Sequence, residues 1–179
     1  MKSKVLALIL LCGAASLGAK VKLPALVGDN MILQQQTEVK LWGTAAPEAE
    51  VRVTPSWNGQ TMTCRADKDG GWTLAVETPA AGYTPYEITF DDGEKTTLKN
   101  ILIGEVWLAS GQSNMEMPLK GFAGCCIMNG ADDIIVSAEN KGVRMFTVPK
   151  HQTYELQTDC KGSWNISSIE TAPDFSATA

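Results

Sequence analysis

At its centre the chain reads Ile101-Leu102-Ile103-Gly104-Glu105-Val106-Trp107-Leu108-Ala109, an apolar run interrupted by a single glutamate. The polar turn Gly111-Gln112-Ser113-Asn114-Met115 follows almost at once. An apolar run of that length, followed by a small polar turn, predicts a buried strand. Open α/β sheets carry their reactive groups just beyond the ends of such strands. We therefore expect Ser113 at the end of a buried strand, as a candidate for chemistry.

A serine hydroxyl becomes an effective nucleophile when a base, usually a histidine, removes its proton. The chain has one histidine, His151, in the loop-like segment Pro149-Lys150-His151-Gln152. We expect this histidine on a surface loop rather than in a catalytic pair. Ser113 is the predicted catalytic residue, and its backbone N–H is the predicted first donor of an oxyanion hole.

Three neighbours of the serine are predicted to support the site. Gly111 allows the backbone to turn sharply and to come close to a substrate, although an ordinary turn glycine fits equally well. Gln112 is expected to brace the turn by hydrogen bonds. Asn114 either contacts the substrate or caps the following segment.

Residues 20–100 are predicted to form a β-sandwich. Short alternating runs recur there, and turn signals such as Asn58-Gly59 and Asp91-Asp92-Gly93 lie between them. The predicted strands are Met31-Ile32-Leu33, Val39-Lys40-Leu41-Trp42, Val51-Arg52-Val53, Trp72-Thr73-Leu74-Ala75-Val76 and Tyr86-Glu87-Ile88-Thr89-Phe90. Trp42 and Trp72 are expected in the core, whereas Trp57 is the one candidate for an exposed, sugar-stacking tryptophan.

Residues 101–179 have a different sequence pattern, which predicts the first strands of an α/β sheet. The run that ends at Ala109 would be its first strand, and residues 143–148 a second. Residues 134–140 are predicted to be a short helix or an irregular segment. Two strands cannot close such a sheet, so this half is expected to be unfinished, with apolar strand edges that favour aggregation.

Residues 1–19 predict a signal peptide, and hence an exported protein of the periplasm or the extracellular space. Lys2 and Lys4 precede the apolar stretch 5–11, and small residues follow at 13–16, 18 and 19. The stretch is too short to span a membrane. Cys12 raises a lipoprotein alternative, which the bulky Leu11 before it disfavours.

Composition narrows the classes of partner. The net charge of -5 and the isoelectric point near 4.9 leave no basic face for nucleic acid. After signal cleavage four cysteines remain, Cys64, Cys125, Cys126 and Cys160, and their pairing is left open: one disulfide or buried thiols. No Cys-x-x-Cys spacing accompanies the lone histidine, so a metal site is not expected.

The block Gly104-Glu105-Val106-Trp107-Leu108-Ala109-Ser110-Gly111-Gln112-Ser113-Asn114-Met115 resembles the first sequence block of the SGNH hydrolases, in their sialate O-acetylesterase-like branch. Val39-Lys40-Leu41-Trp42-Gly43 and Gly71-Trp72 are similar to landmarks of the β-domain that precedes the catalytic domain. The likeness runs from about residue 22 to the last residue. Gln112 departs from the aspartate usual in the wider SGNH group but fits this branch.

The resemblance implies a β-sandwich (20–100) followed by the incomplete start of a flavodoxin-like SGNH hydrolase domain (101–179). It implies hydrolysis of acetyl esters on sugars, including sialic acid, through an acyl-serine intermediate. The family's base lies in a late Asp-x-x-His block, and the sequence has none, so we expect an N-terminal fragment that is inactive alone. The alternative is a secreted β-sandwich module that binds carbohydrate or has a structural role, without catalysis. Oligomeric state stays open.

Overall fold

The computed structural model describes residues 20–176, and the predicted signal peptide lies outside them. No described helix is long and apolar enough to cross a membrane. The elements are β1 (Ile32–Gln34), β2 (Glu38–Thr44), β3 (Glu50–Pro55), β4 (Met62–Arg65), β5 (Gly71–Glu77), β6 (Gly82–Asp91), β7 (Lys95–Gly104), α1 (Ser113–Glu116), α2 (Gly130–Glu139), β8 (Arg144–Phe146), β9 (Trp164–Ile166) and the 3-10 helix η1 (Ala172–Asp174). The described chain is therefore mostly β, with few and short helices.

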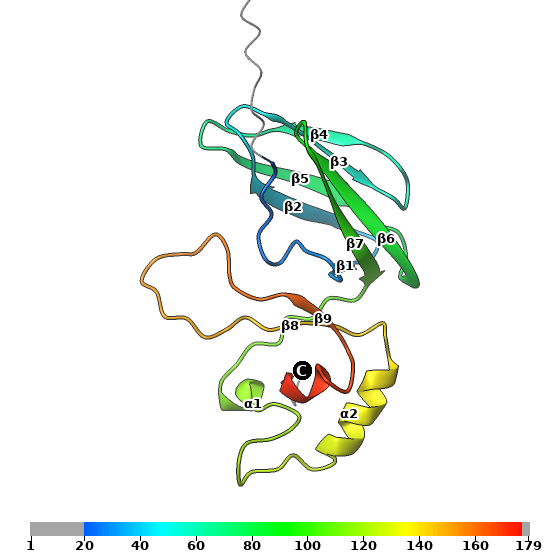
Figure 1. The fold of residues 1–179 in the computed structure, drawn as a ribbon, viewed down its shortest axis with the longest axis vertical. Helices are drawn as coiled ribbons and strands as arrows, with labels where there is room; N and C mark the ends of the chain where they lie inside the picture. Colours follow the sequence, from blue (N-terminus) through cyan, green and yellow to red (C-terminus); the bar gives the residue numbers. More distant parts are fainter. Residues whose placement is uncertain (1–19, 177–179) are drawn as a thin grey trace, which may run out of the picture.

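Strands β1 to β7 form two sheets at one end of the molecule (Figure 1). The larger sheet has the order β1-β7-β6-β3-β4, and the smaller sheet pairs β2 with β5 in antiparallel fashion. Neighbours in the larger sheet are antiparallel except β1 and β7, which run parallel with Ile32 opposite Leu102. The five predicted strands are present. Strand β4 and the first part of β7 were missed.

Both sheets contribute side chains to one hydrophobic core. Strand β5 shows how the sequence directs this, because Trp72, Leu74 and Val76 are buried while Thr73 and Ala75 are exposed. The larger sheet adds Leu33, Val51, Val53, Ile88, Phe90, Leu98, Ile101 and Ile103. Trp72 lies in this core as predicted, and Trp42 packs against it from a half-buried position.

Truncation of Phe90 is expected to cost about 3–5 kcal/mol of stability. The side chain is fully buried (0% exposed), and its ring centroid lies 5.8 Å from that of Trp72. Tyr83, on the same strand, is 80% exposed, so Tyr83→Ala should change stability by about 0.5 kcal/mol or less. Denaturant unfolding of Phe90→Ala and Tyr83→Ala provides the comparison. Equal midpoints for the two variants would contradict this assignment of the core.

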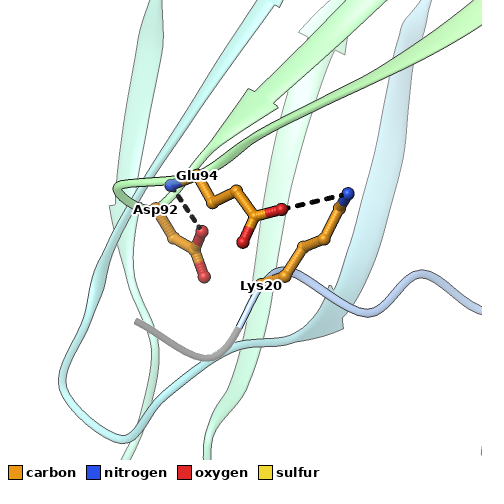
Figure 2. Close-up of polar contacts among 3 residues, drawn as sticks. All are labelled: Lys20, Asp92 and Glu94. Atoms are coloured by element: carbon orange, nitrogen blue, oxygen red, sulfur yellow. Dashed lines mark hydrogen bonds and ion pairs between the residues drawn. The ribbon is translucent and has the colours of Figure 1, made fainter. Parts of the chain in front are cut away.

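The turn between β6 and β7 also holds the start of the described chain (Figure 2). The N–H of Glu94 donates to Asp92 Oδ1 at 3.5 Å, and Glu94 Oε1 lies 3.3 Å from Lys20 Nζ. Gly93 has a φ of 112°, which a side chain would oppose. The turn predicted at Asp91-Asp92-Gly93 is therefore present. The ion pair is solvent-exposed, so we expect it to contribute less than about 1 kcal/mol.

The segment after β7 lies at the other end of the molecule, with α1, α2, β8, β9 and η1 (Figure 1). Strand β8 pairs antiparallel with β9, with Met145 opposite Asn165. Hydrogen bonds join this end to the segment before β1: the N–H of Ala25 donates to Asp159 Oδ1 at 2.9 Å, and Trp164 Nε1 donates to the carbonyl of Leu26 at 2.8 Å. The long loop between β8 and β9 is therefore tied to the first half.

The predicted strand 101–109 is wrong in its second half. Strand β7 ends at Gly104, and residues 105–109 are neither strand nor buried. The reason lies in the neighbouring strands: β1 ends at Gln34, opposite Gly104, and β6 begins at Gly82, opposite Ile103. Beyond these positions the described chain offers no backbone to pair with. Ser113 consequently does not end a buried strand.

The predicted α/β opening is also not formed by the described residues. The predicted second strand exists as β8, but its partner is β9 and not the run before Ser113. Residues 130–139 form the helix α2, which is longer than the short helix considered for residues 134–140. Strand β7 also crosses the predicted boundary at residue 100, because residues 101–104 belong to the five-stranded sheet.

Candidate active site

The turn that carries Ser113 leads into the single helical turn α1. The Gln112 carbonyl accepts hydrogen bonds from the N–H groups of Met115 at 3.0 Å and Glu116 at 3.2 Å. The N–H of Met117 donates to the Ser113 carbonyl at 3.1 Å and closes the turn. Ser113 is thus the first residue of a short helix, and backbone hydrogen bonds hold it there.

The Ser113 side chain faces solvent. Within residues 20–176, neither its hydroxyl nor its backbone N–H hydrogen-bonds to another residue. A substrate could therefore reach both the oxygen that would attack and the N–H that would stabilise an oxyanion. A hydroxyl packed in hydrocarbon would have excluded this chemistry. The exposure leaves the predicted role of Ser113 open to test.

His151 lies in an exposed loop, as predicted. No hydrogen bond or ion pair of the described residues joins it to Ser113. Its neighbour Lys150, however, forms an ion pair with Glu116, so this loop lies against the helix that begins with Ser113. This contact was not predictable from sequence pattern, because its two residues are 34 positions apart.

The three supporting residues behave differently from one another. A Cβ added at Gly111 would lie 3.0 Å from Met115 Cγ, so a larger residue would displace the methionine. Gln112 holds the turn through its carbonyl, whereas its side chain makes no cap hydrogen bond. Asn114 is exposed beside Ser113. Met115 is half-buried, and its sulfur accepts a hydrogen bond from Ser176 Oγ at 3.8 Å, so it packs under the turn.

Glu105 fixes the chain at the point where it leaves the sheet. Gln34 Nε2 donates to Glu105 Oε2 at 3.0 Å, and Gln35 Nε2 donates to Glu105 Oε1 at 2.6 Å. The N–H of Val106 donates to Gln34 Oε1 at 2.9 Å. These hydrogen bonds anchor the first residues of the path to Ser113. These contacts explain why a charged residue, Glu105, occurs within the apolar run.

The amides of Gln34 and Gln35 lower the pKa of Glu105, because they donate to its charged form. The stability from this network should be fully present above the pKa of an unfolded glutamate and lost as the pH falls through the lower folded value. The double variant Gln34→Leu with Gln35→Leu should raise the Glu105 pKa in an NMR titration. Gln60→Leu, at an exposed glutamine elsewhere, should leave it unchanged; an unchanged pKa in the double variant would contradict the assignment.

Trp57, the candidate sugar-stacking residue, is not fully exposed. It is half-buried, its Nε1 donates to the Glu77 carbonyl at 2.9 Å, and its ring packs edge-on against Tyr86. The indole N–H and the ring of Trp57 therefore both make contacts within the fold. This finding weakens the alternative of a sugar-binding module built on Trp57.

Two surface pockets lie away from Ser113. One, of about 530 Å³, lies between Tyr83 and the end of α2. The other, of about 670 Å³, lies between Trp42 and the loop residue Asp159. Cys64, Cys125, Cys126 and Cys160 are all free thiols; Cys125 and Cys126 are exposed, so the prediction of one disulfide or buried thiols is wrong for this pair. No group of three metal-ligating side chains occurs within residues 20–176.

Comparisons with known proteins identify relatives. No family model matches the chain. It is 27% identical over 175 residues to a sialate O-acetylesterase of Rattus norvegicus, with 89% of this chain and 31% of the relative covered. The human enzyme of the same name is 29% identical over 161 residues, which cover 83% and 29% of the two chains. The crystal structure of a novel carbohydrate acetylesterase from Xanthomonas citri superposes with a TM-score of 0.78 and 31% identity, over 88% of this chain and 35% of that one.

The chain is sialate O-acetylesterase-like. The resemblance seen around Ser113 is therefore confirmed by matches that extend over most of the chain. The chain spans about a third of the length of the sialate O-acetylesterases that it matches.

Proposed function

We propose that this chain carries the nucleophile-bearing part of a carbohydrate O-acetylesterase, with Ser113 as the nucleophile. The observation that carries the proposal is the exposed Ser113 hydroxyl at the start of α1, in a chain similar to sialate O-acetylesterases. The alternative role as a binding module has no comparable support, because Trp57 is engaged in the fold.

In the proposed reaction Ser113 Oγ attacks the carbonyl carbon of an acetyl ester. A general base takes the serine proton, and the tetrahedral intermediate expels the sugar oxygen, which receives that proton. Water then attacks the acetyl-serine, releases acetate and restores the hydroxyl. The Ser113 N–H would donate to the oxyanion, an interaction that typically lowers the barrier by about 3 kcal/mol. The step uses neither a metal nor an organic cofactor.

The base is proposed to come from the part of the enzyme that lies outside the matched third of the relatives. His151 has no described contact with Ser113, so this assignment leaves it on its surface loop. Acetylated sugars, including acetylated sialic acid, are the proposed substrates, after the names of the relatives. Export through residues 1–19, and the division into units 20–100 and 101–179, are part of the same proposal.

A chimera tests this function. Residues 20–176 would replace the matched segment of the Xanthomonas citri acetylesterase. Ser113 would then occupy the position of the residue that aligns with it in that enzyme. We expect the chimera to release acetate from O-acetylated sugars, and to do so only with Ser113 present. A folded chimera without acetylesterase activity would overturn the proposal.

A further inference from the structure

The larger of the two surface pockets is a cleft between the β2–β5 sheet and the loop that joins β8 to β9. Its volume of about 670 Å³ lies within the range of ligand-binding pockets, roughly 300–1,000 Å³. Aromatic, hydroxyl and charged side chains line it together, among them Trp42, Thr44, Arg65, Asp67, Thr73 and Asp159. Both halves of the described chain therefore contribute to one cleft, and neither Ser113 nor Trp57 belongs to it.

Trp42 supplies an aromatic wall of the cleft. It follows the buried Leu41 on β2, so strand alternation places it on the other face of that strand, opposite the exposed Thr73 of β5. Part of the Trp42 side chain packs against the core and part lines the cleft, which leaves the residue half-buried. The sequence had placed Trp42 in the core, so this wall was missed.

Two carboxylates of the cleft are held in place by backbone hydrogen bonds. Asp67 Oδ1 accepts from two N–H groups of its own turn, both at 2.8 Å. Asp159 Oδ1 accepts from the N–H groups of Ala25 at 2.9 Å and Cys160 at 2.7 Å. Within residues 20–176, the Oδ2 atom of neither aspartate accepts a hydrogen bond. Each carboxylate is thus fixed through one oxygen and can accept from a ligand through the other.

The charges of the lining favour an uncharged ligand. Lys22 and Arg65 carry positive charge, and Asp67 and Asp159 carry an equal negative charge. An anion would meet the two carboxylates, and a cation would meet the ammonium and guanidinium groups. A sugar suits all of these groups, because its hydroxyls donate to carboxylates and accept from cationic groups. The C–H face of a sugar ring is apolar and can cover an indole.

We infer that this cleft binds an uncharged oligosaccharide, with a sugar ring against Trp42 and hydroxyls donating to Asp67 and Asp159. The inference rests on the proposed function, because the ligand would be the glycan chain that carries the acetyl esters. The site would hold that chain at a distance from Ser113. It also differs from a module built on Trp57, whose indole is bound to the Glu77 carbonyl at the far end of β5.

The test measures glycan binding by the full 179-residue chain. Cellohexaose, xylohexaose and mannohexaose are the uncharged probes for isothermal titration calorimetry, and hexagalacturonate is the anionic one. We expect at least one uncharged probe to bind at a single site, and to bind more tightly than hexagalacturonate. Failure of all three uncharged probes to bind, or a preference for hexagalacturonate, would overturn the inference.

Variants locate the binding site. Trp42→Ala should weaken binding at least about tenfold, because it removes the aromatic wall. Asp67→Asn and Asp159→Asn keep the oxygen that accepts the backbone hydrogen bonds but replace the other oxygen with a donor. Each should also weaken binding at least about tenfold. Asp69→Asn, at an exposed aspartate of the same turn but outside the cleft, should change it less than about threefold.

The two aspartate variants decide the matter even if Trp42→Ala fails to fold, since they preserve the turn and the loop. Unchanged binding in both would contradict the cleft. Loss of binding in Trp57→Phe, with binding intact in both aspartate variants, would place the sugar at Trp57 and overturn the inference.

Ser113→Ala separates this inference from the proposed function. This variant should bind the same oligosaccharide as tightly as the unaltered chain, because Ser113 does not line the cleft. Glycan binding together with an inactive chimera would count against the proposed function and leave the cleft in place. Acetate release that depends on Ser113, from a chain that binds none of the uncharged probes, would overturn the cleft alone.

Discussion

Replacing Ser113 with alanine is expected to lower the turnover number for acetate release by about four to six orders of magnitude in the chimera with the Xanthomonas citri acetylesterase. The substitution removes the oxygen that forms the acyl intermediate, while the fold should persist because the side chain is exposed and has no described partner. The remaining oxyanion donors and binding contacts would leave a small residual rate. Initial rates of acetate release at saturating substrate provide the measurement.

Ser110 offers a matched control for this substitution. It is a second exposed serine in the same segment, three residues earlier, and it does not belong to α1. Ser110→Ala should keep the rate within about threefold, because surface substitutions away from reacting groups have small effects. A loss of less than tenfold in Ser113→Ala would remove this serine from the mechanism. An equal loss in both variants would indicate a damaged turn instead.

The second large effect concerns the chain by itself. The purified 179-residue protein is expected to release acetate at least about 10⁴-fold more slowly than the chimera, because within residues 20–176 no side chain hydrogen-bonds to the Ser113 hydroxyl to take its proton. Acetate release by the chain, by its Ser113→Ala variant and by the chimera should be compared under identical conditions. The chain and its Ser113→Ala variant should give the same low rate.

If the chain alone proved active, a His151 variant would show whether this histidine is the base. Rapid turnover by the chain alone that is lost in both Ser113→Ala and His151→Ala would make this histidine the base. That result would contradict its assignment to the surface loop. It would also require the loop, which Lys150 ties to Glu116, to bring the imidazole to the serine.

The first half of the fold follows largely from local pattern. The residue pattern of Trp72–Val76, in which every second residue is large and apolar, indicates a strand with one buried face. Asp91-Asp92-Gly93 indicates a turn, and its glycine has a positive φ. Strand β4 was not predicted, because Met62–Arg65 is short and its residues are at most half-buried, at alternate positions. Its pairing with β3 comes from the sheet and not from its own composition.

In the second half of the chain, burial could not be predicted from the sequence pattern alone. The run 101–109 has one uniform composition, yet its first part is buried between two strands and its last part is exposed. Burial depends on where neighbouring strands end, which is a property of distant segments. The pattern therefore predicted burial for the whole run, whereas the structure shows it only for residues 101–104.

The candidate site divides in the same way. The Gly111–Asn114 turn was found from sequence because its residues are adjacent, and the comparisons agree with the family that it indicated. The Glu105 network and the Lys150–Glu116 ion pair were missed, because each joins residues far apart in the chain. Such contacts arise only once the fold has formed.

Detection of the acyl intermediate tests the central claim most directly. The chimera would be mixed with an O-acetylated sugar, quenched in acid during the first turnovers, digested and analysed by mass spectrometry. We predict one acetyl group on the peptide that contains Ser113, located on that serine by fragmentation and absent from Ser113→Ala. An active chimera whose acetyl group is found on another residue would contradict the account.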